Sequence, residues 1–413
     1  MLDIKFIREN PKKVKEACDK KNVNNGDSLV EQILEFDTKK RSLLTSLEAL
    51  RAKQNKFTQN DIDEAKKNKL EIKTLEPDLQ ETEKKLEALM LQLPNIPFDD
   101  VPVGKDDSQN VVLRKVGKMP KFGFKVKDYM QLGKDLDLID TQRAAKVAGS
   151  RFGYLKNEMA LLEFATLALA MEVARKKGFV PVIPPVMLQE DMARGTGYFE
   201  LGDEKEAYYL PEDKMYLAGT SEQPMVAMHA SEILELKDLP LRYIAFSTCF
   251  RREAGSYGKD TKGILRVHQF DKVEMVVFST PENSKKEHDL LLSIEEDLMK
   301  KLGLPYQVIN ICTGDLGRPA AKKYDIETWL PSEGKYRETH STSNCTDFQA
   351  RRLNIKYKDK SGKNDFTHTL NGTAFAIGRM LIMILENYQQ KDGSVKVPKA
   401  LQKYAGFKII KPK

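Results

Sequence analysis

Cysteine is scarce and scattered in this 413-residue chain. The four cysteines, Cys18, Cys249, Cys312 and Cys345, form no Cys-x-x-Cys pair, and the five histidines do not complete a zinc-binding spacing. Long apolar runs are also missing, since the longest reach roughly half of the ~20 residues that a membrane helix needs. The first residues, MLDIKFIRENPKKVKE, contain no apolar stretch of the kind that marks a secretory signal. We therefore expect a cytoplasmic protein with free thiols.

Glycine is nearly absent from the first hundred residues, where Gly26 is the only one. Lysine, glutamate, leucine and glutamine dominate this part, whereas glycine, proline and aromatic residues reach ordinary globular frequencies after it. This change in composition falls within the segment LPNIPFDDVPVGKDDSQN (93–110), which is rich in proline and aspartate and predicts a linker. We predict two domains, 1–103 and 104–413. The net charge of +7 is compatible with a nucleic-acid partner but does not identify one.

The N-terminal part carries apolar residues on an alternating four–three spacing, which predicts two long helices that pair along a narrow stripe. The stripe residues are Leu29, Ile33, Phe36, Leu43, Leu47, Leu50 and Phe57, then Ile72, Leu75, Leu79, Leu86, Leu89 and Leu93, with Lys40, Gln54 and Thr82 at its gaps. Polar turn residues lie between the two helices, and Asn60 or Asp61 is a candidate cap for the second. Pro77 should bend the second helix.

The outer faces of this antiparallel helical hairpin are rich in lysine and arginine, with acidic residues interspersed. Two interpretations fit that pattern: a solvated coiled coil, or a basic rod that contacts nucleic acid. The pattern alone favours the first.

The second part is typical of an α+β domain on an antiparallel sheet, because short strands occur in runs and helices stand apart. An amphipathic helix is predicted over Glu158–Lys177, closed by Gly178. The proline-rich VPVIPPVM (180–187) predicts an edge strand or an extended crossing. An apolar helix is expected at about 373–389, in which Arg379 is the only charge before Glu386. A lone arginine there needs an anion, or else reaches the surface from the helix end.

Residues 243–278 predict two strands joined by a glycine- and lysine-rich loop, GSYGKDTKG (255–263). Side chains alternate across a sheet, so Arg251 and Glu253 should share one face and Phe250 and Arg252 the other. On the returning strand we expect Arg266, His268, Phe270 and Glu274 on a common face. Such a polar face is costly to bury, but it suits a nucleotide, because guanidinium binds phosphate and an aromatic ring stacks on a base. The alternative is an exposed sheet face with a mobile loop.

The segment FRREAGSYGKDTKGILRVHQFDKVEM (250–275) resembles motif 2 of class II aminoacyl-tRNA synthetases, in the form found in bacterial-type seryl-tRNA synthetases. The resemblance implies that Arg251 holds the ATP α-phosphate and also contributes to the serine site, and that Glu253 binds the adenine amino group. Phe270 would stack on adenine, and Arg252 and Val267 would lie beside the nucleotide. Glu274 would accept a hydrogen bond from the hydroxyl of serine.

Three further segments extend this resemblance. NGTAFAIGR (371–379) is similar to motif 3, which makes Arg379 the γ-phosphate clamp and places Asn371 and Thr373 at the amino-acid pocket. GTSEQP (219–224) resembles the family's Thr-x-Glu element, so that Thr220, Ser221 and Glu222 would bind the serine ammonium and carboxylate; read by itself, it favours a helix cap. In VPVIPPVM, Pro185 would be the motif 1 proline of the dimer-forming element.

The segment YRETHSTSNCTDFQARR (336–352) resembles the family strand whose glutamate and serine hold Mg²⁺ against the phosphates of ATP. Glu338 and Ser341 occupy those positions, and Thr339 and His340 between them would also line the ATP site. His340 departs from the family pattern, which is Glu-Ile-Ser-Ser.

This end-to-end resemblance implies an enzyme that activates L-serine with ATP and Mg²⁺ and transfers it to tRNA(Ser), leaving tRNA(Sec) open as a second substrate. It also implies a homodimer and a hairpin that recognises the tRNA. Arg251 and Arg379 would be its catalytic residues, and no protein nucleophile is expected. We considered three alternatives: a paralogue that loads a carrier protein, a catalytically inactive paralogue, and a threonine or proline enzyme. The hairpin argues against the first and third, and the intact Arg251, Glu274 and Arg379 argue against the second.

Overall fold

The protein divides into two compact units, Met1–Ile96 and Pro97–Lys413. The computed structural model describes residues 1–58, 60–198, 206–254 and 263–412. Within this part of the chain, no helix is long and apolar enough to cross a membrane.

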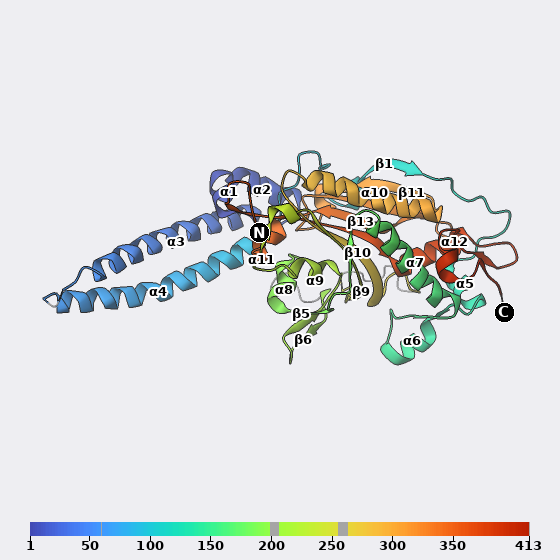
Figure 1. The fold of residues 1–413 in the computed structure, drawn as a ribbon, viewed down its shortest axis with the longest axis horizontal. Coiled ribbons are helices and arrows are strands. Elements are labelled where there is room, and N and C mark those ends of the chain that lie inside the picture. The colour runs from blue at the N-terminus through green and yellow to red at the C-terminus, as the bar shows by residue number, and fades with distance from the viewer. Residues whose placement is uncertain (59, 199–205, 255–262, 413) are drawn as a thin grey trace. The chain divides into compact units, whose positions relative to one another are not determined.

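The first unit is helical and contains the predicted antiparallel hairpin (Figure 1). Two short helices, α1 (Ile4–Glu9) and α2 (Pro11–Lys20), precede the long pair α3 (Gly26–Gln54) and α4 (Ile62–Leu91). Ile33 and Leu47 of α3 and Leu86 of α4 are buried, as the stripe predicted. Pro77 lies inside α4. Asp61 is the N-cap residue of this helix, but the Asp61 carboxylate accepts hydrogen bonds from Thr58 and none from the helix.

The gaps in the apolar stripe are filled by polar contacts between the two helices. Lys40 forms an ion pair with Glu83 at 2.9 Å, and Gln54 accepts a hydrogen bond of 2.7 Å from the buried Asn68. Thr82, which stands in the third gap, is also buried. The helices therefore stay paired along their length although the stripe is interrupted.

The second unit is built on an eight-stranded sheet in which neighbouring strands are antiparallel except for the last pair. The strands lie in the order β1 (Val111–Val116), β11 (Tyr306–Asn310), β12 (Lys322–Leu330), β13 (Lys335–Asn344), β16 (His368–Ala376), β10 (Gln269–Ser279), β9 (Leu241–Phe250) and β4 (Val180–Val182). The proline-containing β4 is an edge strand, as predicted.

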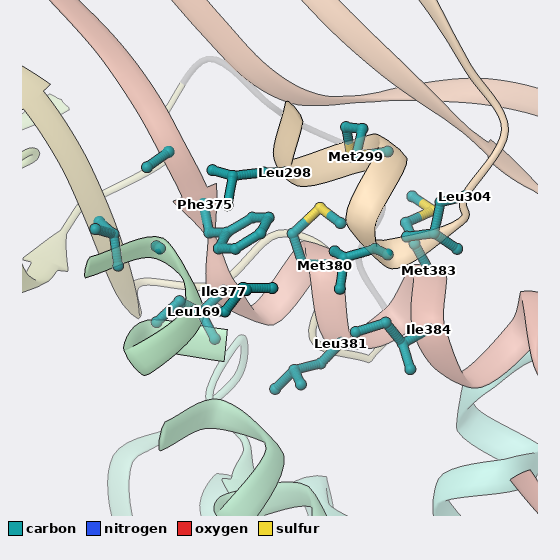
Figure 2. Packing of buried hydrophobic residues seen from close by; sticks show 14 of the residues in the cluster. Leu169, Leu298, Met299, Leu304, Phe375, Ile377, Met380, Leu381, Met383 and Ile384 are labelled. Atoms are coloured by element: carbon teal, nitrogen blue, oxygen red, sulfur yellow. The ribbon is translucent and has the colours of Figure 1, made fainter. Parts of the chain in front are cut away.

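The principal core of the second unit lies between the sheet and the helices α7 (Glu158–Arg175), α10 (Ser284–Leu302) and α12 (Ile377–Asn387) (Figure 2). Met380, Leu381 and Ile384 of α12 are completely buried, because this helix is apolar on nearly every side. The helix begins at Ile377, so the expected start at about 373 was wrong. Residues 368–376 continue the sheet instead, because they pair with β10 on one side and β13 on the other.

Smaller elements complete the second unit. They are α5 (Tyr129–Asp135), α6 (Thr141–Ala148), α8 (Glu190–Gly195), α9 (Glu222–Ala227), α11 (Phe348–Leu353), α13 (Gln402–Ala405), β2 (Ile139–Asp140), β3 (Tyr154–Leu155), β5 (Met187–Gln189), β6 (Tyr209–Leu210), β7 (Met215–Leu217), β8 (Ile233–Glu235), β14 (Lys356–Lys358), β15 (Asn364–Phe366), β17 (Val395–Lys396), β18 (Ile409–Ile410) and short 3-10 turns at Asp107–Gln109, Leu236–Asp238 and Thr313–Asp315. Helices α9 and α11 pack on the sheet face opposite the principal core, where Val276 and Phe278 of β10 meet them.

Candidate active site

A cavity of about 530 Å³ opens on the sheet face opposite the principal core. Its walls come from β10, β13 and β16, the start of α9, the start of α12 and the segment 315–320. This volume lies within the range of small-molecule sites, which is about 300–1,000 Å³.

Strand β10 contributes to the cavity and to the core at the same time. Val273, Met275 and Val277 belong to the principal core, whereas Phe270, Lys272 and Glu274 line the cavity. This is the period-two alternation of a strand, and it confirms that Phe270 and Glu274 share one face.

Glu274 is a buried carboxylate with two partners at the cavity wall. Its Oε2 lies 2.6 Å from Nζ of Lys272 and accepts a hydrogen bond of 3.2 Å from Oγ1 of Thr373. Both members of the ion pair are less than a tenth exposed. Removing one partner of such a buried pair strongly destabilises the folded protein, because the other charge is left without compensation.

Two β-bulges turn additional side chains toward the cavity. On β13, His340 pairs with Ile326 but Glu338 pairs with Glu327, so Thr339 is the extra residue. On β16, Phe375 pairs with Val273 but Thr373 pairs with Glu274, so Ala374 is the extra residue. Because a bulge shifts the alternation by one, residues three apart reach the same side: Glu338 with Ser341, and Thr373 with Ala376.

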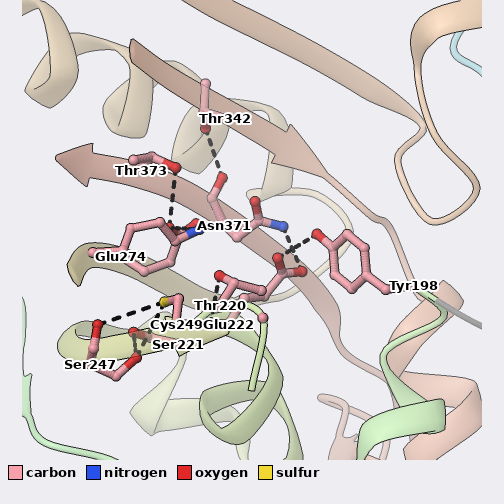
Figure 3. A network of polar contacts seen from close by, with 12 residues as sticks. Tyr198, Thr220, Ser221, Glu222, Ser247, Cys249, Glu274, Thr342, Asn371 and Thr373 are labelled. Atoms are coloured by element: carbon pink, nitrogen blue, oxygen red, sulfur yellow. Dashed lines mark hydrogen bonds and ion pairs between the residues drawn. The ribbon is translucent and has the colours of Figure 1, made fainter. Parts of the chain in front are cut away.

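A second carboxylate, the buried Glu222, stands at the start of α9 within a network of hydrogen bonds (Figure 3). Its Oε1 accepts from Nδ2 of Asn371 at 2.8 Å and from Nε2 of Gln349 at 2.9 Å, and its Oε2 accepts from the hydroxyl of Tyr198. Burial, together with the charge of Glu274, raises the pKa of Glu222 to about 7, although the hydrogen bonds from Tyr198 and Gln349 act in the opposite direction.

Cationic side chains gather at another part of the cavity, around Glu338. Nη1 of Arg379 donates to the Glu338 carbonyl oxygen at 3.0 Å and lies 3.3 Å from its carboxylate. Although desolvation raises the pKa of Glu338, the charges of Arg379, Lys323 and Arg251 outweigh it and hold that pKa well below its ordinary value. Arg379 lies in the first turn of α12, and Lys323 lies on β12.

The two strands on either side of the predicted loop are shorter than the sequence predicted. β9 stops at Phe250 and β10 begins at Gln269, so residues 251–253 are not part of a strand, although Arg251 and Glu253 both line the cavity and Arg252 does not. Glu253 has a positive φ of 52°, which turns the chain out of the sheet, and its carboxylate pairs with Arg266 at 2.6 Å. The guanidinium of Arg251 lies 5.2 Å from the ring centre of Phe270, and its Nε donates to the carbonyl oxygen of Gly219.

All of the predicted site residues line this one cavity except Ser221 and Arg252. The hydroxyl of Ser221 is completely buried and bonds to that of Ser247 at 2.7 Å, while Arg252 lies over the ring of Tyr208. His340 lines the cavity, is buried, and shares a hydrogen bond of 2.9 Å with Thr339; burial lowers its pKa to about 3, so it is neutral at pH 7. Most of the predicted loop 255–263 lies outside the described residues.

Sequence reasoning missed Tyr198, Gln349, Lys272 and Lys323, all of which contact or line the cavity. Lys272 had a local signal, since it stands between Phe270 and Glu274 on the predicted strand. The other three come from segments whose approach to the cavity depends on the tertiary fold.

Comparisons with known proteins agree with this arrangement. Residues 1–97 match the family model described as the seryl-tRNA synthetase N-terminal domain, and residues 208–388 match the class II tRNA synthetase core domain for G, H, P, S and T. The serine–tRNA ligase of Treponema denticola is 44% identical, over 99% of this chain and 100% of its own, and that of Thermococcus onnurineus is 46% identical, over 100% and 97%. The chain belongs to the seryl-tRNA synthetase family.

Solved structures of seryl-tRNA synthetases support the same conclusion. The Pyrococcus horikoshii enzyme complexed with ATP superposes with a TM-score of 0.95 at 43% identity and covers 100% of both chains. The Naegleria fowleri cytoplasmic enzyme in complex with AMP gives a TM-score of 0.90 at 33% identity, over 100% of this chain and 99% of its own. The predicted fold class and the family resemblance are thereby confirmed.

The raised pKa of Glu222 leads to a prediction about stability. A carboxyl whose pKa is higher in the folded state stabilises the fold below its ordinary pKa of 4.5, and this contribution is lost as the pH rises through about 7. Above pH 7 the buried charge should therefore cost about 3 kcal/mol. Glutamine carries no charge at either pH. We therefore expect the free energy of unfolding of Glu222→Gln, relative to that of the unchanged protein, to be higher at pH 8 than at pH 5 by up to this amount. Urea unfolding at the two pH values measures it. The same stability difference at both pH values would contradict the prediction.

Proposed function

We propose that this member of the seryl-tRNA synthetase family activates L-serine with ATP and transfers it to the 3′ end of tRNA(Ser). The serine carboxylate attacks the α-phosphate of ATP, which gives seryl-adenylate and pyrophosphate. A terminal ribose hydroxyl of the tRNA then attacks the acyl carbon of the adenylate, so that serine is transferred to the tRNA and AMP leaves. One observation carries the proposal: a single cavity holds the carboxylates Glu222 and Glu274 in one part and the cations Arg251, Arg379 and Lys323 in another.

The cationic part is suited to a triphosphate. Arg251 binds the α-phosphate and Arg379 the γ-phosphate, since guanidinium groups match phosphate geometry. Phe270 stacks on the adenine, while Glu253, Arg252 and Val267 complete its surroundings. Two observations support this ATP site. All of these residues except Arg252 line the cavity, and the guanidinium of Arg251 lies against the ring of Phe270.

Glu338 and Ser341 fit the role of holding Mg²⁺ against the phosphates. Oxygen ligands suit this ion, which usually takes one or two protein carboxylates and fills its remaining positions with phosphate and water. The bulge at Thr339 turns both residues toward the cavity. When bound, the ion neutralises charge on the phosphates. Arg379, now 3.3 Å from the Glu338 carboxylate, is close enough to turn to the same phosphates.

The acidic part is suited to serine. Glu222 and Thr220 bind the ammonium and carboxylate groups, with Asn371 holding Glu222 in place. Glu274 and Thr373 receive the hydroxyl. A site that hydrogen-bonds a hydroxyl rejects an analogue that lacks it by about 10⁴-fold, because its buried polar groups would be left unpaired.

Positioning and charge stabilisation account for catalysis in this arrangement. Arg251 and Arg379 are the catalytic residues, because they face the charge that develops on the phosphates as the bond to pyrophosphate breaks. The serine carboxylate is itself the nucleophile, so no protein side chain needs to form a covalent intermediate.

Glu274→Gln tests the serine pocket with little change in side-chain size. We expect serine-dependent ATP–pyrophosphate exchange to fall about 10²–10³-fold, as when one partner of a buried charged hydrogen bond is removed. The preference for serine over alanine should fall with it. Glu287→Gln is the matched control, because Glu287 is an equally buried carboxylate paired with Arg242 at 2.7 Å and does not line the cavity. Near-normal exchange in Glu274→Gln would remove Glu274 from the pocket.

The N-terminal region 1–103 is proposed to bind tRNA through its helical hairpin. Six lysines on α3, α4 and the turn between them are exposed, with no ion pair among the described residues: Lys39, Lys56, Lys67, Lys69, Lys73 and Lys84. A rod with such free cations can follow an RNA backbone by shape and charge.

Changing these six lysines to glutamine should weaken tRNA charging and leave adenylate formation intact. We expect kcat/KM for tRNA to fall at least about 10-fold at physiological salt, with a smaller salt dependence, because phosphate contacts are lost. Substitution is preferable to deletion of residues 1–103, since Phe98 and Val101 pack in the second unit. The control changes six exposed lysines of that unit, Lys118, Lys121, Lys125, Lys360, Lys391 and Lys411, and so alters the net charge equally. An equal loss in both variants would refute a specific role for the hairpin.

A homodimer through the region around Pro185 is proposed as the working form in the cytoplasm. Apolar side chains are unusually exposed there: Phe164 of α7 by 67%, Val180 of β4 by 54% and Ile183 by 83%. An edge strand beside such side chains is suited to association with a second copy.

Ile183→Asp should convert the dimer to a monomer in analytical ultracentrifugation, because it places a charge in the apolar contact. Leu113→Asp is the control, since Leu113 is 47% exposed on β1 at the opposite edge of the sheet. The proposal fails if Ile183→Asp remains dimeric or if the unchanged protein is already a monomer.

A further inference from the structure

The hydrogen-bond ladder between β9 and β10 ends in an irregular way, immediately before Arg251. Cys249 and Phe270 are opposite each other, followed by Phe250 and Gln269. The next pair is Arg251 and His268, and in an antiparallel ladder that pair should exchange two backbone hydrogen bonds. Only one of the two is present, from the Arg251 amide to the His268 carbonyl oxygen at 2.9 Å.

The second ladder bond is intercepted by a distant segment. The His268 amide donates to the carbonyl oxygen of Arg151 at 3.0 Å, and the Arg151 guanidinium in turn donates to the carbonyl oxygen of Glu253 at 3.2 Å. The carbonyl oxygen of Arg251 therefore loses its usual backbone donor.

The imidazole of His268 takes the place of that missing donor. Its Nδ1 lies 3.0 Å from the carbonyl oxygen of Arg251, and a carbonyl only accepts, so Nδ1 carries the proton. The ring is held between Phe152 and Tyr208, with centroid distances of 5.4 and 6.3 Å. His268 thus binds both backbone polar groups of Arg251. The side chain of Arg251 is held separately, because its Nε donates to the carbonyl oxygen of Gly219 at 3.0 Å.

We infer that His268 is a positioning residue for Arg251, acting through the Nδ1–H bond to the Arg251 carbonyl oxygen. This inference rests on the proposed contact of Arg251 with the α-phosphate of ATP. Arg251 lies beyond the end of β9, where the sheet no longer fixes the backbone, and Glu253 two residues later has already turned to a positive φ. A guanidinium that stabilises the transition state must be held within a fraction of an ångström, so the substitute bond contributes directly to the rate.

Four substitutions separate the hydrogen bond from the packing of the ring. The Nδ2 of asparagine can stand where Nδ1 stands in histidine, whereas glutamine places its nitrogen near the Nε2 position. Phenylalanine keeps the contacts with Phe152 and Tyr208 but has no donor, and alanine removes both. In serine-dependent pyrophosphate exchange we expect His268→Asn to keep kcat within about 3-fold of the unchanged enzyme. His268→Phe, His268→Gln and His268→Ala should lose about 10–100-fold in kcat, because loss of one positioned electrostatic contact has effects of this order. The KM for serine should change much less than kcat, since His268 does not line the cavity.

Controls distinguish this inference from the function on which it rests. His229→Ala removes a histidine that is bonded to Glu232 and Tyr243 away from the cavity, and it should leave exchange unchanged. Arg251→Ala, measured in parallel, should abolish exchange, and if it does not, the proposed role of Arg251 fails first. With Arg251 established, exchange in His268→Phe that equals or exceeds that in His268→Asn overturns the inference, because ring packing would then be sufficient. A parallel change in the KM for serine would overturn it as well.

Discussion

The alternation of side chains along β10 is the constraint on which the rest of the structure depends. Val273, Met275 and Val277 anchor the strand in the apolar core, and this fixes Phe270, Lys272 and Glu274 on the opposite face. A slip of one residue would place the Lys272–Glu274 pair in the core and the apolar side chains in the cavity. The core therefore stabilises the fold and also holds the register of the polar wall, because both depend on one strand.

The bulges extend this wall beyond what regular strands allow. Strict alternation would send Glu338 and Ser341 to opposite faces, as it would Thr373 and Ala376. The extra residues Thr339 on β13 and Ala374 on β16 bring the two members of each pair to the same face. Thr339 is held in its irregular position by its hydroxyl, which bonds to Thr328 at 2.7 Å and to the Ile326 carbonyl oxygen at 3.2 Å. Bulges near active sites commonly redirect side chains in this way.

Local pattern was sufficient to predict much of this molecule from its sequence. The four–three spacing predicted α3 and α4, and period-two alternation predicted the shared face of Phe270 and Glu274. The errors lie where long-range pairing decides. Residues 373–376 look like the start of an apolar helix, but they belong to β16, which pairs with β10 and β13. The bulges have the same origin, and Gln349 and Tyr198 reach Glu222 only through the tertiary fold. Ser221, which the family resemblance predicts at the serine site, bonds through its hydroxyl to Ser247, a contact that the local sequence does not indicate.

The two parts of the cavity differ in charge, and this makes its electrostatics complementary to a pair of substrates. The charge of Glu274 helps raise the pKa of Glu222, while Arg379, Lys323 and Arg251 together depress the pKa of Glu338. A ligand of opposite charge is complementary to each part. An ammonium group beside Glu222 favours its ionised form, and a triphosphate adds a partner for cations that already face Glu338 and, in the case of Lys323, Asp325. Serine brings the first charge and ATP the second, so each part meets a complementary ligand when both substrates are bound, which is also the condition for adenylate formation.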